Sequence, residues 1–414
     1  MKKEIGVRVD PSFGVAQLLP GLQAAVAANG TWQADMQAAL IATAILTSPP
    51  LYRPFHLNTF WAWLRYGPAI SRAHRELRLR WLWRHIDPHQ KTILSDDFGM
   101  GLPALYLVQN FAFEDFADTQ HLLERLLLGV VSPAAIQKNG AAKLPDFIAI
   151  DSLDRLHILE CKGTQAKPDF GQALRRGVQQ KNNLSNPGIF TSIMVSALFI
   201  PQFRSKSAPE LLFVDPDPDI RFKLLADRVD AKRIRLEVRL QALAKALSAA
   251  GVWQMATGIG TGAVSPDSAA YVRNLGGGEL HSAGFELSAG RWIRRVHVRT
   301  LEPLDKESPT KDEEKLEPVD TYLTISIPDL LMRAVRDAVR DDGIVATDPL
   351  KDWVTASLNE KRSVAASKSL KTRRGNREVS VAAKASSWST SEEEDLATLT
   401  TTADIAFEIT RKRG

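Results

Sequence analysis

Two short apolar stretches separated by a four-residue turn constrain this chain more than any other part of it. Residues 145–150 (PDFIAI) and 156–162 (LHILECK) are dominated by apolar side chains, whereas residues 151–154 (DSLD) between them are mostly polar. This pattern predicts two antiparallel strands joined by a turn. Such a hairpin needs a sheet around it, and predicted helices flank it on both sides. The fold class that we expect is therefore α/β.

Charged side chains interrupt this apolar hairpin at three positions. Side chains alternate between the two faces of a strand, so Glu160 and Lys162 project together while Cys161 faces the other way. Asp146, at the start of the neighbouring strand, can meet them there. Two carboxylates beside an ammonium suit Mg²⁺, which keeps water and phosphate oxygens in its coordination sphere. The alternative is an exposed ion pair between Glu160 and Lys162 on an edge strand.

Pro-Asp followed by Glu-x-Lys at the end of an apolar strand resembles the PD-(D/E)-x-K nuclease superfamily, which includes many restriction endonucleases. The resemblance covers residues 95–216. It implies a restriction-endonuclease-like mixed sheet flanked by helices, in which Asp146 and Glu160 bind Mg²⁺ or Mn²⁺. Lys162 would then orient or deprotonate the attacking water. The implied activity is an endonuclease that hydrolyses DNA phosphodiester bonds, in a setting such as bacterial restriction or anti-phage defence.

A helix is predicted directly after the lysine, over residues 170–184. Many members of the superfamily place a helix there whose Gln or Lys contacts the phosphate, and the matching residues are Gln179, Gln180 and Lys181. Arg176 lies at helical spacing from Gln179 and Gln180 and would face the nucleic-acid backbone with them. The alternative is a solvated polar face.

The acid that relatives often supply from an upstream helix has two candidates here. Asp96 or Asp97 would complete the metal site if a helix carries them. Pro103 leaves this open, because a helix that begins near it would place both aspartates on a loop, with Ser95 and Asp96 as capping residues. A second set, for which acids at a helix start are the ordinary explanation, comprises Glu114, Asp115 and Asp118.

Arginines and tryptophans alternate in a further predicted helix, over residues 72–84. Basic side chains beside aromatic ones suit phosphate neutralisation and base stacking. Tryptophans at helical spacing also fill cores. We expect the tryptophans to be in a core and the arginines to contact phosphate, namely Arg72, Arg75 and Arg78, with Arg80 and Arg84 in the same cluster.

The strand and helix pattern of residues 319–362 resembles the ribbon-helix-helix family of DNA-binding dimers. The resemblance implies that two strands pair across a dimer. Tyr322, Thr324 and Ser326 would then face the major groove. The alternative is a strand and a helical hairpin packed on the nuclease core.

The 414 residues are sufficient for two or three domains, with 44% hydrophobic and 24% charged residues. We expect six segments: a helical N-terminal region (1–92), the nuclease core (93–230), a helix and strand extension (231–301), a linker (302–318), the strand-helix-helix module (319–362) and a basic, largely disordered tail (363–414).

Composition limits where in the cell the protein is expected and which partners it is expected to bind. A single cysteine excludes an internal disulfide. No apolar run reaches membrane-spanning length and no signal peptide is apparent, so we expect a cytoplasmic protein. DNA is the expected partner, with a second copy of the chain or a partner subunit left open. Two alternatives compete with DNA cleavage: RNA cleavage, and a catalytically silent DNA-binding or scaffold subunit with a nuclease-like fold.

Overall fold

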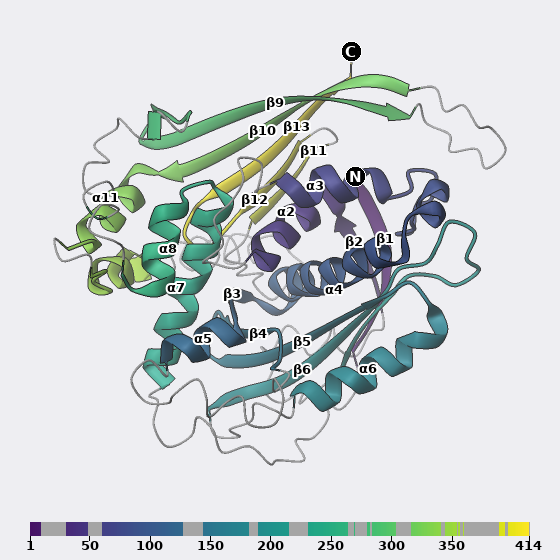
Figure 1. Ribbon diagram of the computed structural model, residues 1–414, viewed down its shortest axis with the longest axis horizontal. Coiled ribbons are helices and arrows are strands. Elements are labelled where there is room, and N and C mark those ends of the chain that lie inside the picture. The colour runs from purple at the N-terminus through teal and green to yellow at the C-terminus, as the bar shows by residue number, and fades with distance from the viewer. Residues whose placement is uncertain are drawn as a thin grey trace, which may run out of the picture.

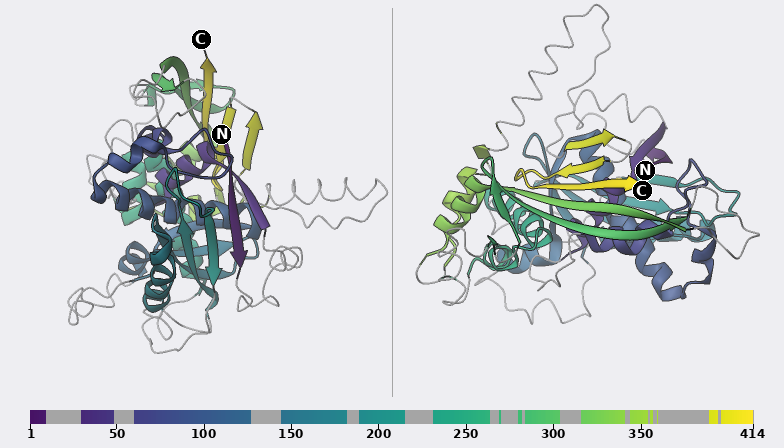
Figure 2. Two further views of the ribbon diagram at one scale, coloured as in Figure 1. Left: turned by 90° about the vertical axis from the view of Figure 1, so that its right-hand side faces the viewer. Right: turned by 90° about the horizontal axis from the view of Figure 1, so that it is seen from above.

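A layer of helices lies between two β-sheets in the computed structural model of the protein (Figure 1). The views in Figure 2 show the second sheet crossing the helical layer, with the C-terminal strand in it. The expected mixed α/β class is therefore confirmed. The structure describes residues 1–9, 30–48, 60–126, 144–181, 189–214, 231–263, 269, 280–281, 284–303, 316–340, 344–353, 355–356, 359, 389–393 and 396–413.

The first sheet has seven strands in the order β2-β1-β7-β6-β5-β4-β3. It is mixed, because β5 pairs parallel with β6 and β1 pairs parallel with β7, while the other neighbours are antiparallel. The predicted hairpin is present as β4 and β5. The strands are β1 (Lys2–Val9), β2 (Gly30–Asp35), β3 (Phe113–Asp118), β4 (Phe147–Asp151), β5 (Leu156–Thr164), β6 (Phe190–Phe199) and β7 (Glu210–Val214).

The prediction of an all-helical region over residues 1–92 is wrong. β1 and β2 extend the sheet that carries the hairpin, and β1 lies next to β7. Ile5, Val7 and Val9 alternate with more exposed residues and are buried. This period of two is the ordinary signature of a strand. A helix is present within this region as α2 (Met36–Thr47), which Asp35 caps by accepting hydrogen bonds from two backbone amides.

The predicted arginine-rich helix over residues 72–84 is also absent. This segment comes after α3 (Trp61–Tyr66) and η3 (Gly67–Ala69). It contains isolated β-bridges and the short 3₁₀ helix η4 (Trp81–His85). Backbone hydrogen bonds join this segment to β1 and to the segment after β6, for example Leu77 N–H to the Glu4 carbonyl oxygen. Pairing with distant segments therefore replaced the local helical pattern.

Helices cover both faces of the first sheet. α4 (Pro88–Phe111) and α2 pack on one face and α6 (Lys167–Lys181) on the other. α4 starts at Pro88, and Asp87 caps it. Pro103 lies inside α4, so the alternative that the helix begins near Pro103 is wrong. The proline removes one backbone hydrogen bond, but burial of residues such as Phe98 and Leu105 on the sheet outweighs that loss.

Three more helices pack around β3 and its neighbours. α5 (Thr119–Leu126) and α7 (Ala231–Ala249) pack on β3, and α8 (Trp253–Thr261) packs on α7. Ile234 and Val238 of α7 meet the apolar side chains of β4 and β5. α7 is the helix expected at the start of the extension over residues 231–301. None of the described helices is long and apolar enough to cross a bilayer.

The second sheet is antiparallel, in the order β11-β12-β13-β10-β9-β8. Buried side chains of β10 and β13, such as Ile325 and Phe407, join the same core as α2 and α4. α11 (Asp329–Ala338) follows β10 directly. The strands are β8 (Glu286–Ser288), β9 (Arg291–Pro303), β10 (Leu316–Pro328), β11 (Ser389–Glu393), β12 (Leu396–Thr400) and β13 (Ala406–Arg413).

This sheet corrects three predictions about the C-terminal half. β10 is paired on both edges, with β9 and β13, so it offers no free edge for the dimeric ribbon of the ribbon-helix-helix family. The linker predicted over residues 302–318 begins and ends in strands, and residues 304–315 lie outside the described residues. The tail predicted to be largely disordered contains β11, β12 and β13, in which Leu399, Phe407 and Ile409 are buried.

Candidate functional site

The β4–β5 hairpin brings Asp146, Glu160 and Lys162 together. Phe147 of β4 pairs with Leu159 of β5, so Asp146 lies beside Glu160. Asp146 Oδ2 accepts a hydrogen bond of 2.7 Å from the backbone amide of Cys161. The Lys162 ammonium forms an ion pair with Glu160. The spatial convergence that we expected from strand alternation is therefore present.

Burial and mutual charge shift the pKa values of the three side chains. Glu160 is fully buried, and burial followed by the nearby Asp146 charge raises the pKa of Glu160 to about 8, although Lys162 opposes the shift. Burial also raises the pKa of Asp146. Burial lowers the pKa of Lys162, but the Glu160 and Asp146 carboxylates raise it more, and the net shift is upward. Lys162 thus keeps its proton at neutral pH.

Among the described residues, the Glu160 carboxylate is contacted by few polar groups. The Lys162 ammonium and the Asp146 backbone amide lie near it. Neither carboxylate oxygen has a well-aligned hydrogen bond among the described residues. A buried carboxylate without such bonds is costly unless a cation or another donor reaches it. Glu160 is therefore a candidate metal ligand.

α4 approaches β5 closely enough to form one wall of the site. A Cβ atom on Gly99 would lie 2.6 Å from the Gly163 amide nitrogen, and one on Gly163 would lie 1.7 Å from the Ser95 carbonyl oxygen. Only glycines permit this contact between the helix and strand backbones. Asp96, in the same turn of α4 as Ser95, is exposed, and partial burial raises its pKa while the charge of Lys162 lowers it. Asp96 therefore lies within electrostatic reach of the site.

Asp97 lies away from the cluster. Its carboxylate accepts a hydrogen bond from the Tyr66 hydroxyl of α3. Burial raises the pKa of Asp97 to about 6, although this hydrogen bond opposes the shift. Asp97 therefore joins α4 to α3, and of the two α4 aspartates only Asp96 is placed to contribute to a metal site.

α6 covers the opposite side of the cluster through a glycine. A Cβ atom on Gly177 would lie 3.3 Å from Glu160 Cγ and 3.5 Å from Lys162 Cγ. Arg176 is exposed on this helix. Gln179, Gln180 and Lys181 occupy its last turn, but their side chains lie outside the described part of the chain.

An ion pair of the buried Lys245 with the partly exposed Asp118, next to Asp146, was only partly anticipated. Lys245 of α7 lies 2.7 Å from Asp118 Oδ1 and donates a 2.7 Å hydrogen bond to the Leu46 carbonyl oxygen. Asp118 pairs with Phe147, the residue after Asp146, and its charge adds to the upward shift of the Asp146 pKa. Asp118 was in the second candidate set. Lys245 gave no sequence signal, because a lysine between apolar helix positions is ordinarily solvated.

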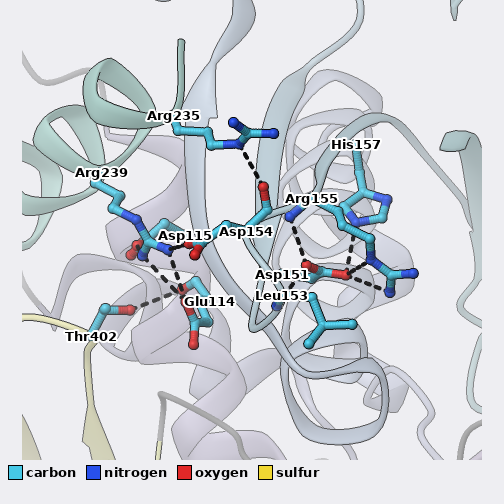
Figure 3. A network of polar contacts seen from close by, with 10 residues as sticks. All are labelled: Glu114, Asp115, Asp151, Leu153, Asp154, Arg155, His157, Arg235, Arg239 and Thr402. Carbon is cyan, nitrogen blue, oxygen red and sulfur yellow. Dashed lines mark hydrogen bonds and ion pairs between the residues drawn. The ribbon is translucent and has the colours of Figure 1, made fainter. Parts of the chain in front are cut away.

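The other acids of that second set have a structural role. Glu114 and Asp115 of β3 are both buried, and Arg239 of α7 forms ion pairs with each of them, at 3.2 and 2.9 Å (Figure 3). Arg239 also binds Asp154 in the β4–β5 turn. Thr402, after β12, donates a 3.1 Å hydrogen bond to the Glu114 carbonyl oxygen and so joins the second sheet to β3. Glu114 is therefore not the extra acid of the site.

Asp151 anchors the same turn and gives a pH-dependent prediction. Burial alone would raise its pKa, but the close contact with the His157 ring at 3.2 Å and the hydrogen bond from Arg155 lower it to about 2 (Figure 3). Because the pKa is lower in the folded state, the carboxylate stabilises the fold at pH values above its unfolded-state pKa. This contribution is lost as the pH falls toward 2. The shift corresponds to about 2 kcal/mol. Urea unfolding between pH 5 and pH 2 should therefore be less pH-dependent for Asp151→Asn than for the wild type, and equal slopes would contradict this role.

The predicted DNA-contacting arginines differ in their surroundings. Arg78 is buried, pairs with Glu76 at 2.7 Å and donates to the Ser205 carbonyl oxygen. Arg75 is exposed but pairs with Glu4 at 2.6 Å. Arg72 is half-buried. Arg78 thus binds groups within the protein, and the contacts of these arginines with phosphate stay a prediction.

Among the described residues, no group of three His, Cys, Asp or Glu side chains is arranged to bind a metal. The two carboxylates at the hairpin still fit Mg²⁺, since this ion uses one or two carboxylates and fills its shell with water and phosphate oxygens. No protein-family model, curated protein or solved structure matches the chain.

Proposed function

We propose that this protein is a metal-dependent nuclease that hydrolyses DNA phosphodiester bonds at the β4–β5 hairpin. The observation that carries the proposal is the buried Glu160 carboxylate, which lies between Asp146 and Lys162 without a well-aligned hydrogen bond. An ion pair retained for stability alone would be better satisfied, as that of Arg239 is. Perturbed acids that converge with a lysine are typical of functional sites.

The three side chains suit separate tasks in phosphodiester hydrolysis. Asp146 and Glu160 would hold Mg²⁺ or Mn²⁺, which supplies charge neutralisation at the phosphate and activates water. Lys162 keeps its proton, so it is suited to orient the attacking water and to stabilise charge on the phosphate oxygens, rather than to act as a base. Asp96 on α4 can add a carboxylate through water.

The arrangement around the hairpin also supports a restriction-endonuclease-like fold. An acid-bearing helix precedes the hairpin, a helix follows Lys162, and a parallel and then an antiparallel strand complete the order. The setting of restriction or anti-phage defence is an expectation that rests on the sequence resemblance alone.

The direct test is incubation of the purified protein with single-stranded DNA, double-stranded DNA and RNA, each with Mg²⁺, Mn²⁺ or EDTA. We expect DNA to be cut with either metal and to remain intact in EDTA, because the carboxylates need the cation to approach a phosphate. Cleavage of RNA alone would change the substrate class. No cleavage of any substrate with either metal would contradict a nuclease.

A catalytically silent DNA-binding subunit is the second candidate, because no group of three His, Cys, Asp or Glu side chains is arranged to bind a metal among the described residues. Isothermal titration of Mg²⁺ or Mn²⁺ distinguishes the two. A nuclease should show a metal-binding heat that Glu160→Ala abolishes, whereas a silent subunit should show none in the wild type.

A further inference from the structure

Two guanidinium groups stack on one tryptophan in the segment before α4. The Arg84 guanidinium carbon lies 3.3 Å from the centre of the Trp81 ring, and that of Arg204 lies 4.0 Å from it. Phe203 packs edge-on against Trp81 at 6.2 Å. Trp81 and Arg84 belong to η4, whereas Arg204 follows β6. We call Trp81, Arg84 and Arg204 the Arg-Trp-Arg cluster.

Within the described part of the chain, no carboxylate pairs with the two arginines of the cluster. Arg84 and Arg204 are exposed, and neither forms an ion pair with a described acidic residue. Neighbouring arginines differ, because Arg8 pairs with Glu210 and Arg75 with Glu4. Stacking on an aromatic ring holds a guanidinium plane in place. The Arg84 Nε–H donates a 2.7 Å hydrogen bond to His85 Nε2, which leaves its two terminal NH₂ groups for an external acceptor.

Hydrogen bonds connect the cluster to the end of β5 that carries Lys162. Gln165, three residues beyond Lys162, donates to the Lys91 carbonyl oxygen at 2.8 Å and to Ser95 Oγ at 3.0 Å. Gln202, just before the Phe203–Arg204 pair, donates to Gln165 Oε1 at 2.6 Å. The cluster is thus tied to the strand and helix that form the site.

A second hydrogen bond ties the other arm of the cluster to α4. The Lys91 ammonium donates to the Arg84 carbonyl oxygen at 2.6 Å. Both arginines are therefore anchored, from η4 and from the segment after β6, to α4, the helix that carries Asp96.

We propose that the Arg-Trp-Arg cluster binds phosphates of the DNA backbone beside the scissile bond, and this inference rests on the proposed nuclease function. Arginine forks match phosphate oxygens bidentately. Two of them fixed on one ring bind neighbouring phosphates with little loss of side-chain entropy. Trp81 acts as a positioning residue for the two forks.

The test measures binding of a fluorescein-labelled DNA duplex by anisotropy, in EDTA and over a range of salt concentrations. We expect Arg84→Gln/Arg204→Gln to weaken binding about tenfold or more at low salt and to reduce the slope of log K against log salt by roughly 2. Trp81→Leu should weaken binding while both charges remain. Wild-type affinity in Trp81→Leu would overturn the role given to the ring.

The matched control is Arg299→Gln/Arg333→Gln, which removes the same charge from exposed arginines on β9 and α11. If it lowers the affinity and slope as much as the cluster variant does, or if the cluster variant keeps the wild-type slope, the proposed surface is wrong. A wild-type protein that does not bind the duplex overturns it too.

Binding in EDTA separates this inference from the proposed function. If the wild-type protein cuts DNA with Mg²⁺ but the cluster variant binds DNA normally, the proposed nuclease function is supported and the proposed binding surface is wrong. If the wild-type protein never cuts DNA but the cluster variant loses DNA binding, the proposed binding surface is supported and the proposed nuclease function is wrong.

Discussion

Lys162→Ala and Asp146→Asn should each reduce DNA cleavage by roughly 10³-fold or more, since each removes a charged group that acts directly on the phosphate or holds the cation there. Single-turnover cleavage of a labelled duplex with Mg²⁺ measures the effect. The two changes should differ in a second readout: Asp146→Asn should weaken the metal-binding heat, whereas Lys162→Ala should retain it.

Both variants should fold. Removing Lys162 leaves Glu160 buried without its counterion, but the pKa of Glu160 is already about 8 with the lysine present. The carboxyl group can therefore take up a proton at neutral pH and avoid an isolated buried charge. In Asp146→Asn the side-chain oxygen can still accept the hydrogen bond from the Cys161 amide. Circular dichroism should show wild-type secondary structure for each.

Lys167→Ala is the matched control for the lysine variant. Lys167 starts α6, is 42% exposed and pairs with Glu210. Its removal changes the net charge equally but lies outside the cluster around Glu160. We expect wild-type cleavage. If Lys162→Ala and Asp146→Asn cut DNA as fast as this control, the assignment of the site is wrong.

The site could be predicted from the sequence where its geometry is local. Asp146, Glu160 and Lys162 lie on two consecutive strands, so the period of two and a short turn bring them together without any information about distant segments. Lys245 could not be found in this way, because α7 and Asp118 lie far apart in the chain and meet only through the tertiary fold. The role of Glu114 depends in the same way on Arg239.

The fold was predictable where one segment forms one element, as for α2, β4, β5 and α7, and less so where the sheet recruits distant chain. β1 pairs with β7, and β13 pairs with β10. Their alternating apolar residues, such as Ile5 and Val7 or Phe407 and Ile409, carried the signal of a strand. Basic or helix-forming neighbours obscured that signal, because composition averages over segments longer than a strand.

Substitution of Arg239, which joins α7 to β3, is expected to cause the largest loss of stability. Its guanidinium is the counterion of Glu114 and Asp115, whose side chains are only 1% and 5% exposed. Burial lowers the pKa of Arg239, but the Asp115 and Glu114 charges raise it more. Arg239→Met would keep most of the apolar volume and leave two buried acids without a cation. We expect the free energy of unfolding to fall by about 3–5 kcal/mol.

Arg235→Met on the preceding turn of α7 provides the control for this prediction. Arg235 is only partly covered and donates a single hydrogen bond, to the Asp154 carbonyl oxygen, as Figure 3 shows. Its removal should cost less than about 1 kcal/mol, as for other exposed polar contacts. Urea unfolding at neutral pH compares the two, and equal losses would show that the buried acids do not depend on Arg239.

A compensating variant separates loss of the ion cluster from loss of packing at Arg239. Combining Arg239→Met with Glu114→Gln and Asp115→Asn removes both buried negative charges, so the triple variant should recover part of the lost stability.

Because Thr402 binds the Glu114 carbonyl oxygen, the cluster also joins the β12–β13 turn to β3. Both sheets should therefore unfold in one transition in the wild type. Arg239→Met should shift that transition for tryptophans of both sheets, Trp32 in β2 and Trp292 in β9, and a shift confined to one of them would show that the cluster does not couple the sheets.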